Sequence, residues 1–336
     1  ACPGYKILVT FFSPSGYEIR KNYPGADYIF YLPPDTPRNV RRFMAIVRPK
    51  IAVFVKYEFW VNYLLAMKRA GTKLYLISSI FRDGQIFFRP YGGLFRSALR
   101  AFRHIFVQND SSRNLLKSIG IEQVSVAGDT RFDRVYEIAQ QAKRLPEIER
   151  FAADAPVFIA GSTWPPDEEL LVGLIERYPD VKFIVAPHEI DPARIEKFCE
   201  RISRPALRYT QLTPQSDLAA AGVLFVDTIG ILSSVYRYGR WGYIGGGFGA
   251  GIHNTLEAAT FGLPLAFGPR YGKFREARDL VTLRGAASIA SAEELERWFA
   301  GLHDDPDATG RSGTICKEYV LQHKGATARI MDEICR

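Results

Sequence analysis

Short runs rich in β-branched and aromatic residues alternate with amphipathic stretches of about ten to fifteen residues along the whole chain. This alternation is typical of parallel sheets whose strands are joined by crossover helices. With 336 residues, and roughly 100 to 200 residues to a domain, the chain is long enough for two such domains. It is therefore predicted to be an α/β protein made of two doubly wound domains.

Turn residues separate the predicted strands from the predicted helices. Strands are expected at residues 5–12, 28–31, 51–55, 73–77, 104–107, 123–126, 157–160, 182–186, 223–226, 242–244 and 263–266. The clearest helices are 35–47, which ends before Pro49, and 60–70, which ends at Gly71. Both ends are as expected, because proline stops a helix and glycine favours the backbone conformation of a helix end.

A segment without a strand signal divides the two halves of the chain. Residues 131–154 carry many charges and are expected to link a first domain, 1–130, to a second domain, 155–325. The last stretch, 326–336, has a helical pattern with no strand after it, and we expect it to pack back on the first domain. Ligands of doubly wound sheets bind at the carboxyl ends of the strands, so a cleft between the domains is the expected site.

The charge balance favours anionic partners. Lys and Arg number 44 and Asp and Glu 36, a net charge of +8, which suits nucleotides, phosphorylated lipids, an acidic membrane surface or nucleic acid. Apolar residues at 47% and charged residues at 24% are ordinary globular values and exclude a disordered, collagen-like or coiled-coil chain.

The cysteines and the hydropathy pattern indicate a cytoplasmic setting. Cys2, Cys199, Cys316 and Cys335 are scattered and form no CxxC pair, so they are expected to be reduced thiols. No stretch approaches the ~20 consecutive apolar residues that span a bilayer, and the N-terminus does not have the pattern of a signal peptide. We therefore expect a soluble or surface-bound chain.

The most informative stretch is a glycine-rich loop within residues 241–257. A predicted strand leads into five glycines within seven residues, Gly246 and Gly247 among them, and a helix is expected to open with His253 and Asn254. Glycines allow a ligand to approach the backbone, and a helix start attracts phosphate. Glu257, one turn on, could accept two hydrogen bonds from a ribose. The alternative is a glycine-rich turn with Asn254 as an ordinary N-cap; we favour the nucleotide interpretation.

Polar or glycine residues follow three other predicted strands of the second half. They are Ser162 and Thr163, then His188, then Asp227, Thr228 and Gly230. Each has a simpler explanation: helix capping for Thr163, Asp227 or Thr228, and a structural role for a lone histidine. Together they predict the rim of a nucleotide pocket.

In the first half, Glu58 comes directly after the predicted strand 51–55 and lies among aromatic residues. Aromatic surroundings raise the pKa of a carboxyl group, which would suit Glu58 to base chemistry or to orienting a substrate. The alternative is a glutamate that caps the first turn of the following helix.

A second basic feature is an arginine-aromatic segment between Phe81 and Arg103. Its arginines include Arg82, Arg89, Arg96 and Arg100, and Arg96, Arg100 and Arg103 have the spacing of one helical face. The segment would suit binding to a phosphorylated amphiphile or to an anionic membrane. The alternatives are a basic face that is only solvated, or a groove that binds nucleic acid. Nucleic acid is disfavoured because no RNA-binding signature accompanies the segment. No zinc spacing or Walker loop is present, so neither metal nor cofactor is expected.

These residues resemble the 3-deoxy-D-manno-octulosonic acid (Kdo) transferases of bacterial lipid A assembly. The similarity runs over nearly the whole chain and is clearest at Tyr57-Glu58-Phe59-Trp60, Val107-Gln108-Asn109, Val126-Ala127-Gly128-Asp129-Thr130-Arg131-Phe132-Asp133, Gly161-Ser162-Thr163, Asp227-Thr228-Ile229-Gly230, His253-Asn254-Thr255-Leu256-Glu257-Ala258-Ala259 and Gly268-Pro269.

The resemblance implies a GT-B fold, two doubly wound Rossmann-like domains facing across a cleft. It implies that the second domain binds CMP-Kdo and that the first domain binds a phosphorylated lipid A precursor. The implied reaction is an inverting transfer of Kdo that needs no metal ion. It would take place at the cytoplasmic face of the bacterial inner membrane. Thr163, His188, Gly230, Asn254 and Glu257 would line the CMP site. Lys273 or Arg275 would stabilise the leaving phosphate, Glu58 would lie on the acceptor side, and the arginine-aromatic segment would meet lipid.

The chain also departs from the family pattern. Relatives usually begin with a membrane anchor and a first strand whose glycine-rich loop carries the glutamate thought to be the catalytic base, and this sequence is expected to start after that loop. The arginine often found beside His188 is missing, and Ile231 replaces a common acid. Two alternatives stay open: a GT-B enzyme that uses a UDP-sugar, and a non-catalytic basic protein that binds lipid or nucleic acid.

Overall fold

The computed structural model describes residues 4–335, and the chain divides into two compact units. The first unit runs to Thr130 and includes the C-terminal segment from Gly325; the second unit is Arg131–Lys324. Each unit is built around parallel β-sheet, as the alternating sequence pattern predicts.

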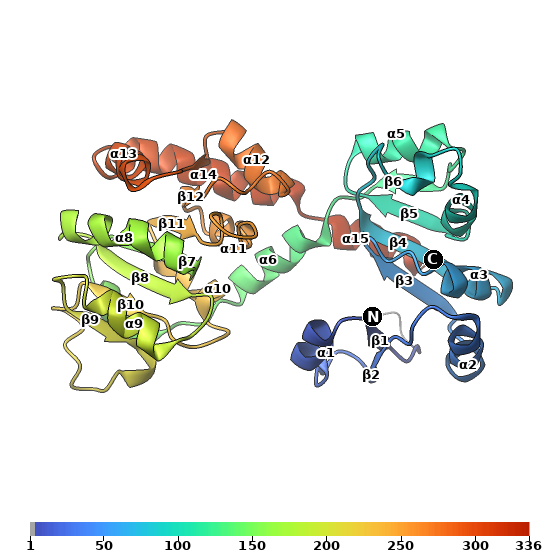
Figure 1. The fold of residues 1–336 in the computed structure, drawn as a ribbon, viewed down its shortest axis with the longest axis horizontal. Helices are drawn as coiled ribbons and strands as arrows, with labels where there is room; N and C mark the ends of the chain where they lie inside the picture. Colours follow the sequence, from blue (N-terminus) through green and yellow to red (C-terminus); the bar gives the residue numbers. More distant parts are fainter. Residues whose placement is uncertain (1–3, 336) are drawn as a thin grey trace. The chain divides into compact units, whose positions relative to one another are not determined.

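The β-structure of the first unit is divided into two parallel sheets (Figure 1). One pairs β1 (Leu8–Phe11) with β2 (Tyr28–Tyr31). The other has the order β3-β4-β5-β6, with β3 (Ile51–Val55), β4 (Lys73–Ser79), β5 (His104–Val107) and β6 (Val124–Val126). Within residues 4–335, β1 and β3 each pair on one side only.

Helices connect these strands, and the C-terminal helix covers one face of the larger sheet. The helices are α1 (Pro14–Arg20), α2 (Pro37–Val47), α3 (Val61–Arg69), the short 3-10 helix η1 (Ile86–Phe88), α4 (Gly93–Leu99), α5 (Asp110–Ser118) and α15 (Ala326–Ile334). Ile330 and Ile334 of α15 pack with Tyr75 and Phe106 of the sheet. The guanidinium of Arg329 donates to the Ala127 carbonyl at 3.1 and 2.7 Å.

The second unit contains one continuous parallel sheet of seven strands, in the order β13-β12-β11-β7-β8-β10-β9. The strands are β7 (Val157–Thr163), β8 (Lys182–Pro187), β9 (Ala206–Arg208), β10 (Val223–Phe225), β11 (Trp241–Ile244), β12 (Leu265–Phe267) and β13 (Ala286–Ser288). Side chains alternate across β7: Val157 and Ile159 enter one core, Phe158 and Ala160 the other. The sheet therefore separates two hydrophobic cores.

Helices cover both faces of this sheet (Figure 1). They are α6 (Thr130–Gln140), α7 (Pro146–Ala152), α8 (Pro165–Arg177), α9 (Pro192–Cys199), α10 (Leu232–Val235), α11 (Leu256–Thr260), α12 (Arg275–Thr282), α13 (Ala292–His303) and α14 (Pro306–His323), with 3-10 helices η2 (Tyr209–Gln211) and η3 (Tyr236–Tyr238).

Residues 131–154, expected to be a linker, form most of α6 and all of α7 and belong to the second unit. Phe132 and Val135 on α6, and Ile148 and Phe151 on α7, are buried in one of its cores. Both pairs are three residues apart, which places each pair on one helical face. The segment is therefore structural rather than a flexible connection.

Two further features bear on the sequence predictions. Cys199 and Cys316 carry free thiols, as predicted, but Cys335 is disulfide-bonded, so the prediction of a reduced thiol is wrong there. Cys2 lies outside the described residues. Among residues 4–335, no helix has both the length and the apolar character needed to cross a bilayer.

The strand order of the second unit indicates where a ligand would bind. From β7 the chain moves outward through β8 to β9 at the sheet edge, places β10 between β8 and β9, and then returns to β11 on the other side of β7. Neighbouring strands whose connections leave in opposite directions create a crevice at their carboxyl ends. The loops after β7 and β11, both singled out in the sequence, lie at this switch point.

Candidate functional site

The loops after β7 and β11 are joined by the carboxylate of Asp167, in the first turn of α8. Asp167 is fully buried, and its Oδ2 accepts hydrogen bonds from the backbone N–H of Trp164 (2.9 Å) and of Gly246 (2.8 Å). Its Oδ1 accepts one from the Tyr243 hydroxyl (2.7 Å). Burial, and then the charge of Asp167, raise the pKa of Tyr243, so the hydroxyl stays a donor.

Glycines of the β11 loop allow close packing against its neighbours. A Cβ at Gly245 would lie 2.2 Å from the Ser162 carbonyl oxygen, and one at Gly247 would lie 2.5 Å from the Cα of Gly268. Gly246 has a φ of +92°, which non-glycine residues rarely adopt. Gly246 and Gly247, predicted to let a ligand approach, are buried and serve to pack three loops backbone against backbone.

Arg270 holds the outer half of the same loop. Its Nη1 donates to the Gly249 carbonyl oxygen at 2.7 Å, and its backbone N–H donates to that of Gly247 at 2.9 Å. The side chain is exposed. Sequence reasoning missed Arg270, although it follows directly on Gly268-Pro269 beyond β12, where another strand reaches the same edge of the sheet.

The two predicted phosphate-stabilising cations are placed differently. Arg275 forms an ion pair with Asp279 one turn along α12, with Nε 3.3 Å from Oδ2. Lys273 is exposed, in the loop before α12. Arg270 is therefore the cation in contact with the glycine loop, while Arg275 is partly neutralised by its own helix.

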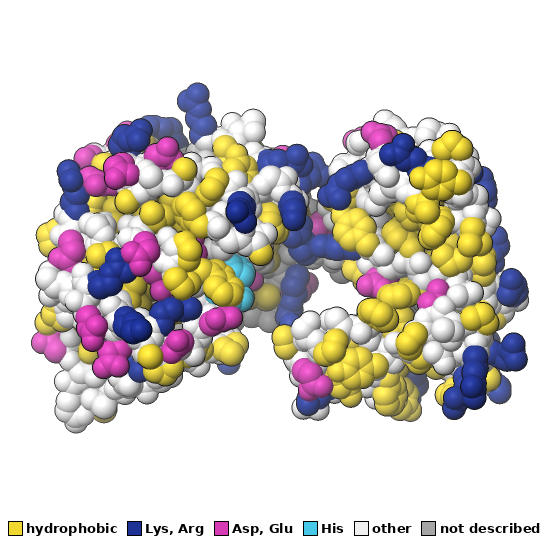
Figure 2. All heavy atoms as spheres, viewed as in Figure 1, with side chains coloured by type: hydrophobic (Ala, Val, Ile, Leu, Met, Phe, Trp, Pro, Cys, Tyr) yellow, Lys and Arg dark blue, Asp and Glu magenta, His cyan; other side chains and the backbone are white. Residues whose placement is uncertain are grey.

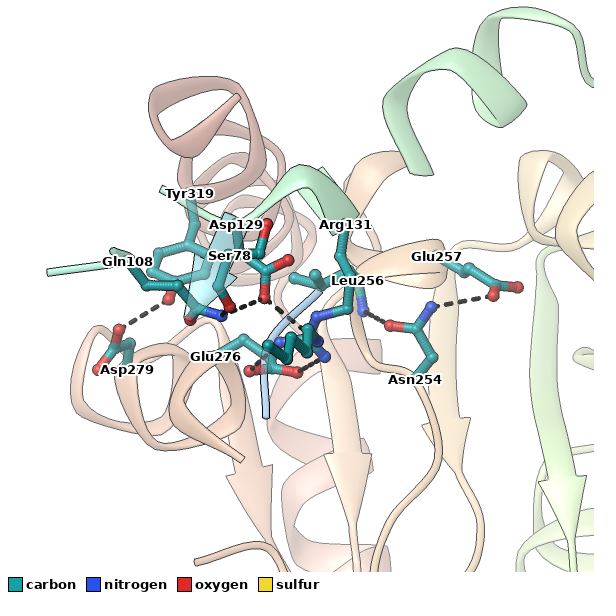
Figure 3. Close-up of polar contacts among 11 residues, drawn as sticks. Ser78, Gln108, Asp129, Arg131, Asn254, Leu256, Glu257, Glu276, Asp279 and Tyr319 are labelled. Carbon is teal, nitrogen blue, oxygen red and sulfur yellow. Dashed lines mark hydrogen bonds and ion pairs between the residues drawn. The ribbon is translucent and has the colours of Figure 1, made fainter. Parts of the chain in front are cut away.

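Asn254 and Glu257 lie next to each other after the glycine loop (Figure 3). The helix starts at Leu256, later than predicted, and Asn254 Oδ1 accepts a hydrogen bond from the Leu256 N–H at 3.1 Å. This supports the capping interpretation of Asn254. The helix has only five residues, so His253 precedes it and the predicted helix-dipole contribution is small.

Glu257 is half-buried. Its Oε1 accepts a hydrogen bond from Asn254 Nδ2 at 3.0 Å, and burial raises the pKa of the carboxyl group despite that bond. In the described part of the chain, no lysine or arginine forms an ion pair with Glu257. A carboxylate in this state has acceptor capacity left for hydroxyl groups of a ligand.

Thr255, between these two residues, was not predicted. Its side chain is 1% exposed, and its hydroxyl has no hydrogen-bond partner among residues 4–335. A buried hydroxyl without a partner is costly, so it marks a place where a polar ligand atom or a water molecule would be stabilising. Nothing in the sequence distinguishes this threonine from a capping residue.

His188 and His253 meet Trp164 in a group of three rings. The ring centroids of Trp164 and His188 are 4.8 Å apart, and those of His188 and His253 4.2 Å, both stacked. The indole Nε1 of Trp164 donates to His253 Nε2 at 3.1 Å. Figure 2 shows histidine side chains at the surface of the second unit. The structure thus brings together the loops after β7, β8 and β11.

Two residues predicted for the pocket rim point into the protein. Thr163 is fully buried and its hydroxyl donates to Glu168 Oε1 at 2.9 Å. Asp227 is 5% exposed and accepts hydrogen bonds from Arg208 Nε and from Thr210 N–H and Oγ1, at 2.9, 2.8 and 2.6 Å. The side chains of Thr163 and Asp227 therefore stabilise the loops through hydrogen bonds inside the protein.

The other predicted rim residues are more accessible. Ser162 is half-buried with a φ of 56°, in the left-handed region. Thr228 is half-buried, and Gly230, with a φ of 94°, is exposed before α10. These three residues keep access to solvent at the carboxyl edge of the sheet.

In the first unit, Glu58 is exposed rather than enclosed by aromatic rings. The indole Nε1 of Trp60 donates to its Oε2, and the ring of Phe12 lies tilted against that of Trp60 with 4.6 Å between ring centroids. Helix α3 begins at Val61, so Glu58 lies before the helix and does not cap its first turn. An accessible carboxylate held by an indole N–H is available to a ligand.

Arg96, predicted to face lipid, is used inside the protein. Its guanidinium donates to the carbonyl oxygens of Phe87, Arg89 and Pro90, at 3.1, 2.7 and 3.2 Å. Helix α4 ends at Leu99. The prediction that Arg96, Arg100 and Arg103 share one helical face is therefore wrong, because the helix stops before Arg100.

Most aromatic residues of the arginine-aromatic segment form core. Phe81, Phe87, Phe88 and Phe95 contact one another or Phe59 with centroid distances of 4.8 to 6.3 Å. The charged and large apolar members that remain exposed are Arg82, Asp83, Arg89, Tyr91, Leu94, Arg100 and Arg103.

A polar network at the strand ends of the first unit was not predicted. Gln108 Nε2 donates to the Ser78 carbonyl oxygen (2.8 Å) and to Asp129 Oδ2 (2.9 Å), as Figure 3 shows. Lys56 Nζ lies 3.7 Å from Asp129 Oδ2. Lys56 and Ser78 have φ of 59° and 52°, an unusual conformation that is common at functional sites. No group of three or more potential metal ligands occurs among residues 4–335.

Comparison with known proteins shows which family the chain is similar to. Residues 1–134 match the family model described as 3-deoxy-D-manno-octulosonic-acid transferase (kdotransferase). The 3-deoxy-D-manno-octulosonic acid transferase of Haemophilus influenzae is 24% identical over 351 residues, which covers 98% of this chain and 80% of the relative. That of Aquifex aeolicus is 26% identical over 289 residues, 84% of this chain and 74% of the relative.

A solved structure supports the fold. The UDP-GlcNAc 2-epimerase of Neisseria meningitidis bound to UDP-GlcNAc superposes with a TM-score of 0.68 at 15% identity, over 98% of this chain and 91% of that one. At this identity the likeness concerns fold alone, and it confirms the predicted GT-B type of α/β architecture. The sequence matches confirm the resemblance to a glycosyltransferase family.

Proposed function

Because this chain is related to the Kdo transferases, we propose that it is a glycosyltransferase that moves Kdo from CMP-Kdo to a phosphorylated glycolipid, a lipid A precursor. The observation that carries the proposal is the half-buried carboxylate of Glu257, without a cationic partner in the described part of the chain, beside the glycine loop at the switch point of the second sheet. This is where doubly wound sheets bind nucleotides.

Glu257 is proposed to hold the ribose of the donor. A carboxylate accepts hydrogen bonds from both hydroxyls of a ribose, and Asn254 fixes its orientation through Oε1. Hydrogen bonds to a charged group contribute about 1.5–3 kcal/mol each. The carboxylate therefore provides affinity for the nucleoside and fixes the position of the phosphate relative to the loop.

The leaving phosphate is assigned to Arg270 and to the loop it holds. As the bond between the anomeric carbon and the phosphate oxygen breaks, negative charge grows on CMP, and a nearby guanidinium stabilises it. The acceptor hydroxyl forms the new bond to the anomeric carbon and loses its proton to a base. We propose that this charge stabilisation needs no metal ion.

The acceptor is proposed to bind the first unit. Its arginine-aromatic segment presents Arg82 and Arg89 with Tyr91 and Leu94, a combination of charge and apolar surface that suits an anionic lipid layer. Glu58 is proposed to orient the acceptor as an accessible carboxylate. This would make the chain a peripheral protein of the cytoplasmic face of the inner membrane.

Product analysis by mass spectrometry tests the proposal. The chain is incubated with CMP-Kdo and a lipid A precursor, with and without EDTA, beside a version extended at its N-terminus. We expect lipid whose mass is increased by one or more Kdo units, in amounts that EDTA does not change. No Kdo adduct with either version would contradict the transfer, and activity lost in EDTA and restored by a divalent cation would contradict its metal independence.

The donor site is tested separately by calorimetry with CMP. Glu257→Gln keeps the size of the side chain but removes its charge, and we expect CMP affinity to fall about tenfold to a hundredfold. Glu293→Gln, an exposed position on α13, is the matched control and should bind as the native protein does. Equal affinity in Glu257→Gln would remove Glu257 from the site. Tighter binding of UDP than of CMP would favour a UDP-sugar donor.

A further inference from the structure

The three rings at the switch point make contacts that constrain their protonation. Trp164 comes from the loop after β7, His188 from the loop after β8, and His253 from the loop after β11. His188 stacks on both other rings, and Trp164 and His253 are joined edge to edge by the hydrogen bond from Nε1 to Nε2 at 3.1 Å. His188 is the exposed member of the group.

The hydrogen bond between Trp164 and His253 fixes where the imidazole proton lies. An indole nitrogen can only donate, so the Nε2 of His253 that faces it must be unprotonated. A neutral imidazole with a free Nε2 carries its proton on Nδ1. Among residues 4–335 the structure records no hydrogen-bond partner for Nδ1. The ring is thus a donor whose N–H is available.

The surroundings of His253 favour the same neutral form. Burial is the main effect that lowers the pKa of His253, and the adjacent His188 adds to it, while Asp167 acts in the opposite direction. On its remaining side the ring lies against Gly246, where a Cβ would be 3.0 Å from the His253 Cδ2. Protonation at Nε2 would place two N–H groups face to face and break the contact with Trp164.

We propose that Trp164 is a positioning residue: its indole N–H holds His253 as a neutral imidazole with the proton on Nδ1, so that the ring donates a hydrogen bond to a phosphate oxygen of the nucleotide. The identity of that oxygen rests on the proposed function; the tautomer does not. The His253 ring then contributes a hydrogen-bond donor in a fixed position at the glycine loop. The positive charge at the site comes from Arg270.

Imidazole nitrogen NMR of the free protein tests the tautomer. Long-range proton–nitrogen spectra distinguish protonated from unprotonated ring nitrogens, and a His253→Asn variant identifies the His253 signals. We expect a protonated Nδ1 and an unprotonated Nε2 at neutral pH. A protonated Nε2 in the native protein would overturn the proposal.

Trp164→Phe separates the hydrogen bond from the stacking. Phenylalanine can still stack on His188 but cannot donate, so we expect the proton of His253 to move toward Nε2 and its titration midpoint to rise. Trp298→Phe, the same change at a half-buried position on α13, is the control and should leave the His253 signals unaltered. An unchanged tautomer in Trp164→Phe would also overturn the proposal.

Titration with CMP tests the role toward phosphate. In the native protein we expect the Nδ1 proton signal of His253 to shift on binding, and in Trp164→Phe the affinity to fall roughly three- to tenfold, the range expected for one net hydrogen bond. CMP that binds without moving the Nδ1 signal would overturn the inference. If CMP does not bind the native protein, the proposed donor site fails, while the free-protein spectra still decide the tautomer.

Discussion

The two units differ in how their sheets are completed. In the second unit β7 lies inside a continuous seven-stranded sheet, and all but one of its residues are buried. In the first unit the strands form two separate sheets, and within residues 4–335 the edges of β1 and β3 that face away from β2 and β4 are unpaired. Parallel sheets are usually covered on both faces, so strands left as exposed as β2 and β3 of the first unit are unusual.

Exposed apolar side chains follow the same division. Val53 and Val55 of β3 are 44% and 46% exposed, and Phe30 of β2 is 58% exposed. In Figure 2 the hydrophobic side chains of the first unit form wide yellow areas. Exposed apolar surface and unpaired strand edges are where proteins bind lipids or other chains. Within residues 4–335 the two units therefore differ in how completely their strand edges are paired and their apolar side chains are covered.

Native-state hydrogen exchange is the strongest way to break this comparison. We expect amides of β7 and β8 to exchange only through global unfolding, and those of β1 and β2 to exchange orders of magnitude faster through local opening. Mass spectrometry of proteolytic fragments resolves the four strands. Equal protection of β1 and β7 would show that the divided sheet is no weaker than the continuous one.

Asp167→Asn is expected to have the next largest effect, confined to the second unit. The change removes a buried charge that accepts hydrogen bonds from Trp164, Tyr243 and Gly246, so unfolding should become easier by about 2–4 kcal/mol. Urea unfolding gives the free energy, and hydrogen exchange shows which unit is affected. Asp154→Asn, an exposed position, is the control and should change stability by less than about 0.5 kcal/mol.

Charge reversal tests the proposed lipid contact of the first unit. We expect Arg82→Glu with Arg89→Glu to weaken binding to anionic liposomes by about 2 kcal/mol or more, since each basic residue near such a surface contributes about 1 kcal/mol. Co-sedimentation gives the partition coefficient. Arg41→Glu with Arg42→Glu, exposed on α2, has the same net charge and should bind better than the first variant. Equal loss in both would indicate a non-specific charge effect.

The smallest expected effect is on the pH dependence of stability, which should have opposite signs in the two units. In the second unit, burial lowers the pKa of His303, but hydrogen bonds to Asp304 and Asp180 outweigh it and the net pKa is raised. In the first unit, burial lowers the pKa of His104, although Glu333 opposes it.

A raised pKa means that the folded form binds the proton more tightly. The contribution of His303 is therefore fully present below the ordinary pKa of about 6.5 and is lost as pH rises through the raised value. For His104 the sign is reversed: stability falls as pH drops below about 6.5 toward its lowered value.

Hydrogen exchange in α13 and β5 between pH 5 and 8 follows the two effects separately. We expect changes below about 1 kcal/mol, as for ion pairs near the surface. His303→Gln should abolish the pH dependence in α13 and leave that of β5 intact. The same sign in both segments would contradict the assignment.

Much of the fold could be predicted from the sequence. The predicted bounds of β2, β3 and β5 are those of the structure, because each is a continuous run of strand-forming residues between turn residues. The strands that were missed, β9 and β13, have three residues each and lie at the edges of the sheet. Segments this short carry no periodic signal.

The candidate site was predicted less completely. The loops after β7, β8 and β11 were identified correctly as neighbours at one sheet edge, because strand ends follow directly from strand positions. Which side chains point outward was not predictable. The register shift between Gly161 and Thr163 changes the direction of the side chains there, and Thr163 ends up buried.

The sequence by itself determined the alternation of strands and helices, the position of the glycine loop and the resemblance to the Kdo transferases, since each depends on residues close together in the chain. Tertiary structure alone decided that Arg96 caps carbonyl groups, that Arg270 holds the glycine loop, and that His253 accepts from Trp164. Those contacts join different loops or turns, and a hydrogen bond forms only where folding places a donor within about 3 Å of an acceptor at the right angle.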